Sequence, residues 1–264
     1  INIPNSVETI CNKVFINCVS LQKIKLPIKI KSIGHYVFYN CSKLNDVKLN
    51  TILETIGSYS FSKCSSLTAI HLPHNLLRIE TNLFSDCTSL EQIEIPDFVD
   101  MIDTEAFSGC LKLKNIIFNK RVEIIIGVRA FQNCVSIPEI KILPNIKHVY
   151  SQAFKSCTKL KKVIVDPYQT EIEPDSFMKC ISFETLVIDT TQKEICAFES
   201  LPFRFYKHVK TIIIPYNVIK LGDYCFQGFP NLIEVQFPHC LLSIGKYCFL
   251  SCVGLRNIKI PDAI

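Results

Sequence analysis

The chain repeats one pattern of apolar and polar positions about every 23 residues. A clear copy runs from Phe84 to Pro96, FSDCTSLEQIEIP, with Phe, Cys, Leu, Ile, Ile and Pro at fixed offsets. The ten steps from Phe15 to Phe249 cover 234 residues, which gives a mean period of 23.4. Such a period is typical of a solenoid, in which similar coils stack on one another. The phenylalanines at this position are Phe15, Phe38, Phe61, Phe84, Phe107, Phe131, Phe154, Phe177, Phe203, Phe226 and Phe249.

Each copy predicts a short strand followed by a turn and a second extended segment. In Ile93–Ile95 the apolar residues alternate with Glu94, which is the pattern of a strand with one buried face. Pro96 ends this strand because proline cannot donate to a ladder of backbone hydrogen bonds. A second apolar pair then follows, typified by Ile30 and Ile33. In five copies a glycine comes next, where we expect a positive φ: Gly34, Gly57, Gly127, Gly222 and Gly245.

The remaining part of each copy predicts the outer side of a curved solenoid. Phe84, Cys87 and Leu90 are three residues apart, which suits a short helical turn or a 3₁₀ segment. Helical turns are bulkier than strands, so we expect the parallel sheet on the concave side and the turns on the convex side. About eleven coils at roughly 4.8 Å each would form an array about 50 Å long. We therefore expect one domain over residues 1–264, with both chain ends falling within a repeat.

Cysteine recurs at one position of the repeat. Tyr206 and Phe229 fill the same position elsewhere, so the position is most simply buried and apolar. Stacked coils would separate successive Cβ atoms by about 4.8 Å, which is wider than the roughly 3.8 Å of a disulfide. Free buried thiols are thus predicted, and a zinc site is the less favoured alternative because no CxxC pair occurs. The nine cysteines are Cys18, Cys41, Cys64, Cys87, Cys110, Cys134, Cys157, Cys180 and Cys252.

The repeat also resembles a known family. The strand motif LxxIxIP matches the general leucine-rich repeat consensus, and the unit IGxxAFxxCxxLxxIxIPxxV resembles the BspA-like leucine-rich repeat family. Clean copies are Ile56 to Pro73, IGSYSFSKCSSLTAIHLP, and Ile244 to Pro261, IGKYCFLSCVGLRNIKIP. The resemblance covers essentially the whole chain and implies an α/β leucine-rich repeat solenoid. It also implies a bacterial or protist protein, often at the cell surface, whose repeats serve adhesion or protein binding without catalytic residues.

The search for other chemistry gives no catalytic, cofactor or metal site. The chain has no GxSxG, Walker, GxGxxG or HExxH motif, and its histidines are scattered, so we do not expect an enzyme. The outward lysines Lys23, Lys25 and Lys48 cluster only near the start, which is too short a basic stripe for nucleic acid. No 18-residue apolar run predicts a membrane span, and the first residues do not resemble a signal peptide. Cytoplasm and cell surface both stay open.

The candidate binding surface is the outward side of the predicted sheet. Four apolar residues, Ile117, Ile164, Val187 and Ile213, would form a stripe there, with Lys141 between the first two. Exposed apolar surface often marks a protein contact. Two alternatives are that β-branched residues simply suit parallel strands, or that the irregular segment Asp189 to Tyr206 folds over the stripe. The predicted partner-binding residues on the concave face are Lys25, Lys48, His71, Glu94, Ile117, Lys141, Ile164, Val187 and Ile213.

The sequence therefore predicts a recognition module that binds a protein on its concave face, as a surface adhesin or as a scaffold. The alternative is a targeting or regulatory arm of a larger multidomain protein, since both chain ends fall within a repeat. Terminal coils without an identifiable polar cap would also allow end-to-end or homo-oligomeric association. The segment Asp189 to Tyr206 is either a tolerated insertion or a bulge that helps to form a binding site.

Overall fold

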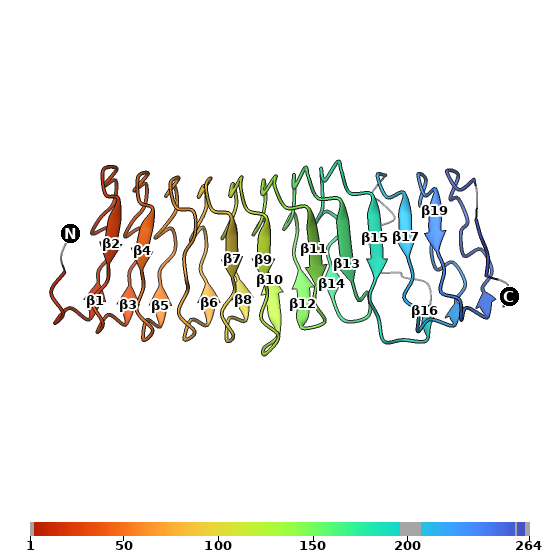
Figure 1. The fold of residues 1–264 in the computed structure, drawn as a ribbon, viewed down its shortest axis with the longest axis horizontal. Coiled ribbons are helices and arrows are strands. Elements are labelled where there is room, and N and C mark those ends of the chain that lie inside the picture. The colour runs from red at the N-terminus through yellow and green to blue at the C-terminus, as the bar shows by residue number, and fades with distance from the viewer. Residues whose placement is uncertain (1–2, 196–206, 257, 262–264) are drawn as a thin grey trace.

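A computed structural model describes residues 3–195, 207–256 and 258–261. The coils follow one another in chain order along the long axis of an elongated molecule (Figure 1). The described residues contain twenty strands, and every strand pairing joins equivalent parts of neighbouring coils in parallel. The prediction of a parallel-strand, leucine-rich-repeat-like solenoid is thus confirmed.

The first sheet comes from the LxxIxI motif of each copy. It is divided into three groups, β2-β4, β7-β9 and β11-β13-β15-β17-β19. Within each group, residues of the same repeat position face each other across the strands, as Ile164 faces Val187. The strands are β2 (Lys23–Lys25), β4 (Asp46–Lys48), β7 (Gln92–Glu94), β9 (Asn115–Ile117), β11 (Glu139–Ile142), β13 (Lys162–Val165), β15 (Thr185–Ile188), β17 (Thr211–Ile213) and β19 (Glu234–Gln236).

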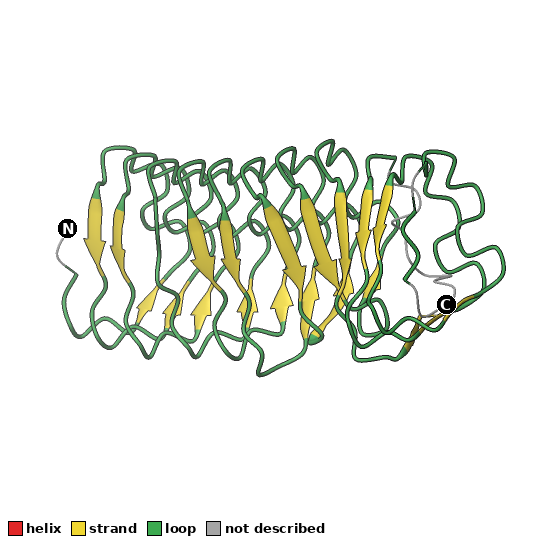
Figure 2. Ribbon diagram, turned by 45° about the vertical axis from the view of Figure 1, so that its right-hand side comes forward, coloured by secondary structure: helices red, strands yellow, loops and turns green. Residues whose placement is uncertain are grey.

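The second sheet comes from the second apolar pair of the copies, is built mostly from shorter strands and is divided into three groups, β1-β3-β5, β6-β8-β10-β12-β14 and β16-β18-β20. Figure 2 shows the two rows of strands and, beyond them, a side made only of loops and turns. The strands are β1 (Thr9–Ile10), β3 (Ser32–Ile33), β5 (Thr55–Ile56), β6 (Arg78–Ile79), β8 (Met101–Ile102), β10 (Ile124–Ile126), β12 (Ile146–Val149), β14 (Glu171–Ile172), β16 (Glu194–Ile195), β18 (Lys220–Leu221) and β20 (Ser243–Ile244).

The prediction of helical or 3₁₀ turns on the outer side is wrong. The described residues form linked turns there and contain no helix. Backbone amides alternate in direction: Ser85 N donates to Asn82 O within the coil at 3.2 Å, whereas Phe84 N donates to Ala106 O of the next coil at 2.8 Å. A helix would keep both amides within the coil. The positive φ angles of Asn82 (54°) and Asp86 (59°) also interrupt a helical backbone. Nothing in the described chain could therefore cross a membrane as a helix.

Ladders of identical side chains form one continuous core along the stack. The ring of Phe84 stacks between those of Phe61 and Phe107, with centroids 5.5 and 5.4 Å away and planes tilted by 7° and 10°. Such stacked pairs are each worth about 0.5–1.5 kcal/mol beyond the apolar area that they bury. Phe203, which the repeat also assigns to this stack, lies outside the described residues.

The glycines that follow the second apolar pair do not have the expected positive φ. Among the described glycines, positive φ is found at Gly109 and Gly228 instead. Gly127 is required for another reason: a Cβ built there would lie 2.8 Å from Ile102 O and 2.9 Å from Asp103 C. Close approach of neighbouring backbones, and not backbone conformation, therefore explains the glycine.

Candidate functional site

The outward face of the first sheet brings three of the predicted apolar residues together. Strands β13, β15 and β17 place Ile164, Val187 and Ile213 directly beside one another in register. Their neighbours along each strand are buried in the core, whereas these three side chains are half-buried on the outward face. We call Ile164, Val187 and Ile213 the apolar stripe.

Charged side chains border the apolar stripe. Lys141 precedes Ile164 in register, and its Nζ lies 2.8 Å from Asp189 Oδ2. Because β13 lies between β11 and β15, the Lys141 stem must cross β13 to reach Asp189, so it covers one edge of the stripe. Lys162 forms an ion pair with Glu139 at 2.8 Å at the N-terminal ends of β13 and β11. The stripe is thus a small apolar area within a charged surround.

The apolar stripe does not continue to Ile117, because Lys141 on β11 takes the place between them and β9 and β11 are unpaired. At the start of these strands an amide normally donates to the preceding coil, as Lys114 N does to Glu91 O at 2.9 Å. The equivalent residue of the next coil is Pro138, which has no N–H to donate. A cavity of about 190 Å³ lies at this break. Ile117, 53% exposed, lies on the other side of it, beside Glu94.

The other predicted residues lie in separate parts of the same face. Lys25 and Lys48 are direct neighbours in register on β2 and β4, and both are exposed. Glu94 faces Ile117 across β7 and β9. His71 is exposed in a coil whose residues 68–73 form no strand. The structure therefore groups the predicted site into a charged N-terminal part and an apolar C-terminal part.

The cysteines of the repeat form a ladder with a polar role that the sequence did not predict. Cys18 is half-buried, and the others are buried. Eight of these thiols donate a hydrogen bond to the phenylalanine carbonyl of the preceding coil, with Sγ–O distances between 3.0 and 3.4 Å. Burial raises the pKa of Cys41 to about 11 and the pKa of Cys87 further. Phe229 is buried as well, and Tyr206 lies outside the described residues.

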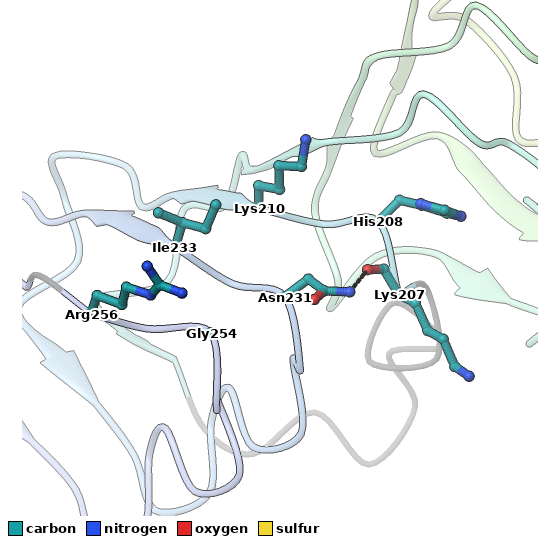
Figure 3. A pocket seen from close by; sticks show the side chains of 7 residues that line it. All are labelled: Lys207, His208, Lys210, Asn231, Ile233, Gly254 and Arg256. Atoms are coloured by element: carbon teal, nitrogen blue, oxygen red, sulfur yellow. Dashed lines mark hydrogen bonds between the residues drawn. The ribbon is translucent and has the colours of Figure 1, made fainter.

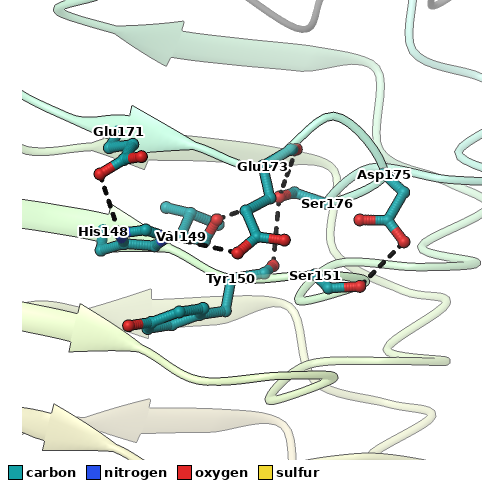
Figure 4. A network of polar contacts seen from close by, with 8 residues as sticks. All are labelled: His148, Val149, Tyr150, Ser151, Glu171, Glu173, Asp175 and Ser176. Carbon is teal, nitrogen blue, oxygen red and sulfur yellow. Dashed lines mark hydrogen bonds and ion pairs between the residues drawn. The ribbon is translucent and has the colours of Figure 1, made fainter.

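The second sheet carries a polar cluster around His148 (Figure 4). Its Nδ1 lies 3.2 Å from Glu171 Oε2, and its Nε2 lies 3.6 Å from Glu173 Oε1. The nearby serines bond elsewhere: Ser151 donates to Asp175, and Ser176 bonds to backbone carbonyls. Neither serine hydroxyl therefore bonds to the His148 imidazole. No group of three or more potential metal ligands is found in the part of the chain that the structure describes.

Bacterial leucine-rich repeat proteins are among the solved structures that match this chain. One from Bacteroides ovatus is 21% identical, with a TM-score of 0.46, and the match covers 98% of this chain and 83% of that one. A leucine-rich cell surface protein from Faecalibacterium prausnitzii is 22% identical, with a TM-score of 0.46 and coverage of 96% and 83%. The T. pallidum leucine-rich repeat protein is 21% identical, with a TM-score of 0.39 and coverage of 95% and 72%.

The family is shown by sequence. A search of curated proteins finds no match. The model of the BspA-type leucine-rich repeat region matches in six copies, over residues 1–112, 77–201 and 170–264. These ranges overlap and reach both ends, so they include every coil described above. The chain belongs to the BspA-type leucine-rich repeat family.

Proposed function

We propose that this chain is a non-enzymatic protein-recognition module that binds its partner on the outward, concave face of the first sheet. The observation that carries the proposal is the apolar stripe. Ile164, Val187 and Ile213 are aligned on adjacent strands and half-buried, in a row whose other members are mostly polar. Contiguous apolar surface within a polar rim is typical of a protein contact. Membership of a repeat family is consistent with an adhesion or interaction role.

The rigidity of the face supports the same proposal. Each inward neighbour of the stripe, such as Leu186, is fully buried in the continuous core. The strands are also paired on both sides from β13 to β17. A partner would therefore meet side chains that are already in place, so little conformational entropy would be lost on binding. We further propose that residues 1–264 form one domain of about eleven repeats, since a single core runs through the stack.

The remaining predicted residues have secondary roles in this proposal. Lys141 borders the stripe and can exchange its exposed partner Asp189 for a group of the binding protein. Ile117 lies beyond the break at Pro138 and can contact only a partner that extends past it. Lys25, Lys48, His71 and Glu94 offer a charged surface to such an extended partner.

The test is a double substitution of the stripe, Ile164→Asp with Ile213→Asp. Both residues are half-buried on the surface, so thermal unfolding should change little, whereas two carboxylates in the contact should abolish capture of the partner. The matched control is Leu77→Asp with Ile181→Asp, which introduces the same two carboxylates at exposed apolar residues outside this face. A photo-crosslinking residue at Val187 should label the same protein that the stripe variant loses. Equal capture by the folded stripe variant and the control would refute the proposed face.

A further inference from the structure

A basic pocket lies beside the apolar stripe, at the N-terminal ends of β17 and β19 (Figure 3). Its volume is about 410 Å³. Four of its seven lining residues have cationic or protonatable side chains, and none is acidic. The lining residues are Lys207, His208, Lys210, Asn231, Ile233, Gly254 and Arg256.

Positive charge exceeds negative charge around this pocket. Glu184 pairs with Lys210 at 2.8 Å, and this hydrogen bond, with further attraction from Lys161 and His208, lowers the pKa of Glu184. The Glu184 carboxylate thus interacts with three basic groups, those of Lys210, Lys161 and His208. Within the described residues, Lys207 and Arg256 form no ion pair. The Lys210–Glu184 pair is itself about half exposed, so Lys210 can exchange its partner at little cost.

The arrangement of the basic groups suits an extended ligand. Lys210, Ile233 and Arg256 occupy one repeat position in three successive coils, so the two basic residues stand about 10 Å apart along the sheet. Figure 3 shows them on opposite sides of Ile233, while Lys207 and His208 extend in other directions from the adjacent loop. Binding of a single small anion would require these side chains to converge on one point, and they do not. An extended segment can present carboxylates about 7 Å apart on one side, which matches a spread set of cations.

The pocket is within reach of a partner bound to the stripe. Lys210 immediately precedes β17 and lies three residues before Ile213, or about 10 Å along the chain. We propose that the basic pocket binds an acidic segment of the protein partner, next to the apolar residues of that partner that contact the stripe. This inference rests on the proposed function, because it names the chemistry of the same partner. Complementary charge of this kind speeds association and selects the partner.

The experiment uses fluorescein-labelled hexaglutamate as the probe and measures its anisotropy on titration with the full chain. Wild-type protein should bind at low salt and more weakly at about 0.15 M salt, since screening acts over about 8 Å there. Lys207→Glu with Arg256→Glu should lower the affinity at least about tenfold, or about 1.4 kcal/mol. The control, Lys29→Glu with Lys31→Glu, changes the net charge equally at two exposed lysines near the N-terminal end of the stack, outside the first sheet, and its affinity should stay within about twofold of wild type.

Three results would overturn the inference. One is absence of binding at low salt, and another is an equal loss in both charge variants, which would indicate a net-charge effect. The third is tighter binding of a heparin-derived hexasaccharide with the same sensitivity to Lys207→Glu and Arg256→Glu, which would assign the pocket to a sulfated polysaccharide. Hexaglutamate has no apolar side chain, so Ile164→Ser with Ile213→Ser should leave its binding unchanged. Failure of the stripe and failure of the pocket can thus be told apart, with circular dichroism confirming that each variant is folded.

Discussion

Replacing Gly127 by alanine would test how closely the coils are stacked. The added Cβ would lie 2.8 Å from Ile102 O and 2.9 Å from Asp103 C, both of which are backbone atoms of the preceding coil. Non-bonded heavy atoms prefer about 3.5–4.0 Å, so the two coils would have to separate locally by about 1 Å. Because the contacts are with backbone, no side-chain rotation can relieve them.

The expected loss of stability follows from two terms. Inserting a methyl group into a well-packed region costs about 1–3 kcal/mol. The carbonyl of Ile102 also accepts a hydrogen bond from Gly127 N at 2.7 Å, and separating the coils would weaken a bond worth about 0.5–1.5 kcal/mol. Other coils hold Glu80 and Tyr150 at the equivalent position, so a wider local spacing is attainable. We therefore expect Gly127→Ala to lower the free energy of unfolding by about 2 kcal/mol.

The matched control is Gly109→Asn in the neighbouring coil. Gly109 has a φ of +77°, but the equivalent residue in the next coil is Asn133 with a φ of 60°. The group nearest to an added Cβ is the carboxylate of Asp86, which is exposed and can rotate away. Asparagine tolerates this conformation, so we expect a change within about 0.5 kcal/mol.

Urea unfolding followed by far-UV circular dichroism measures both variants. Tyrosine fluorescence serves as the second probe, because the chain has nine tyrosines and no tryptophan. Hydrogen exchange around Gly127 shows whether the loss is local, as expected for a stack in which each coil contacts only its neighbours. If Gly109→Asn destabilises the protein as much as Gly127→Ala does, backbone conformation and not close approach limits these glycines, and the reasoning is refuted.

Three further predictions concern the break and the thiol ladder. Pro138→Thr supplies an N–H at the start of β11, so β9 and β11 should be able to pair. We therefore expect the amide of residue 138 to become protected from hydrogen exchange. Rapid exchange of this amide would show that another cause separates the strands. Cys110→Ala removes a buried donor and should cost about 1–2 kcal/mol in urea unfolding, whereas Cys110→Ser, which keeps a donor, should cost less; the reverse order would refute the polar role. Burial raises the pKa of Cys41 from 9.0 to about 11, so the unfolded thiol ionises first as pH rises. Its contribution to stability is complete below pH 9 and should be lost between pH 9 and 11. If the urea midpoint of Cys41→Ala depended on pH between 9 and 11 as the midpoint of the wild-type protein does, the predicted contribution of Cys41 would be contradicted.

The periodic positions allowed most of the fold to be predicted from the sequence. Ile93 and Ile95 are each 1% exposed on either side of exposed Glu94, as their alternation indicates. The outer turns were not predictable in this way, since a spacing of three residues fits a 3₁₀ segment and a run of linked turns equally well. What separates the two structures is the positive φ at Asn82 and Asp86, which the spacing of the apolar residues does not indicate.

The candidate site depends on contacts between coils that a linear pattern does not contain. Ile117 and Ile164 have the same place in the repeat, but Lys141 lies in the coil between them, and the sheet breaks at Pro138 between β9 and β11. The structure shows which amides donate to the preceding coil, and Pro138 lacks the N–H equivalent to that of Lys114, which donates to Glu91 O. Lys207 and Arg256 are likewise far apart in sequence and line one pocket because their coils stack.

The break at Pro138 also limits the size of the proposed contact. The five strands from β11 to β19 span four spacings, or about 19 Å, which equals about six residues of an extended chain lying across them. A stable protein interface buries about 800 Å² on each partner, and three half-buried side chains provide much less. A partner that binds stably must therefore use surface beyond the apolar stripe. Two neighbouring surfaces are available: the basic pocket at the N-terminal ends of β17 and β19, and the charged face beyond Pro138. The pocket adjoins the stripe on a paired sheet, whereas the charged face lies across a break in the hydrogen bonding. The physically simpler contact is a short segment with apolar residues followed by acidic ones.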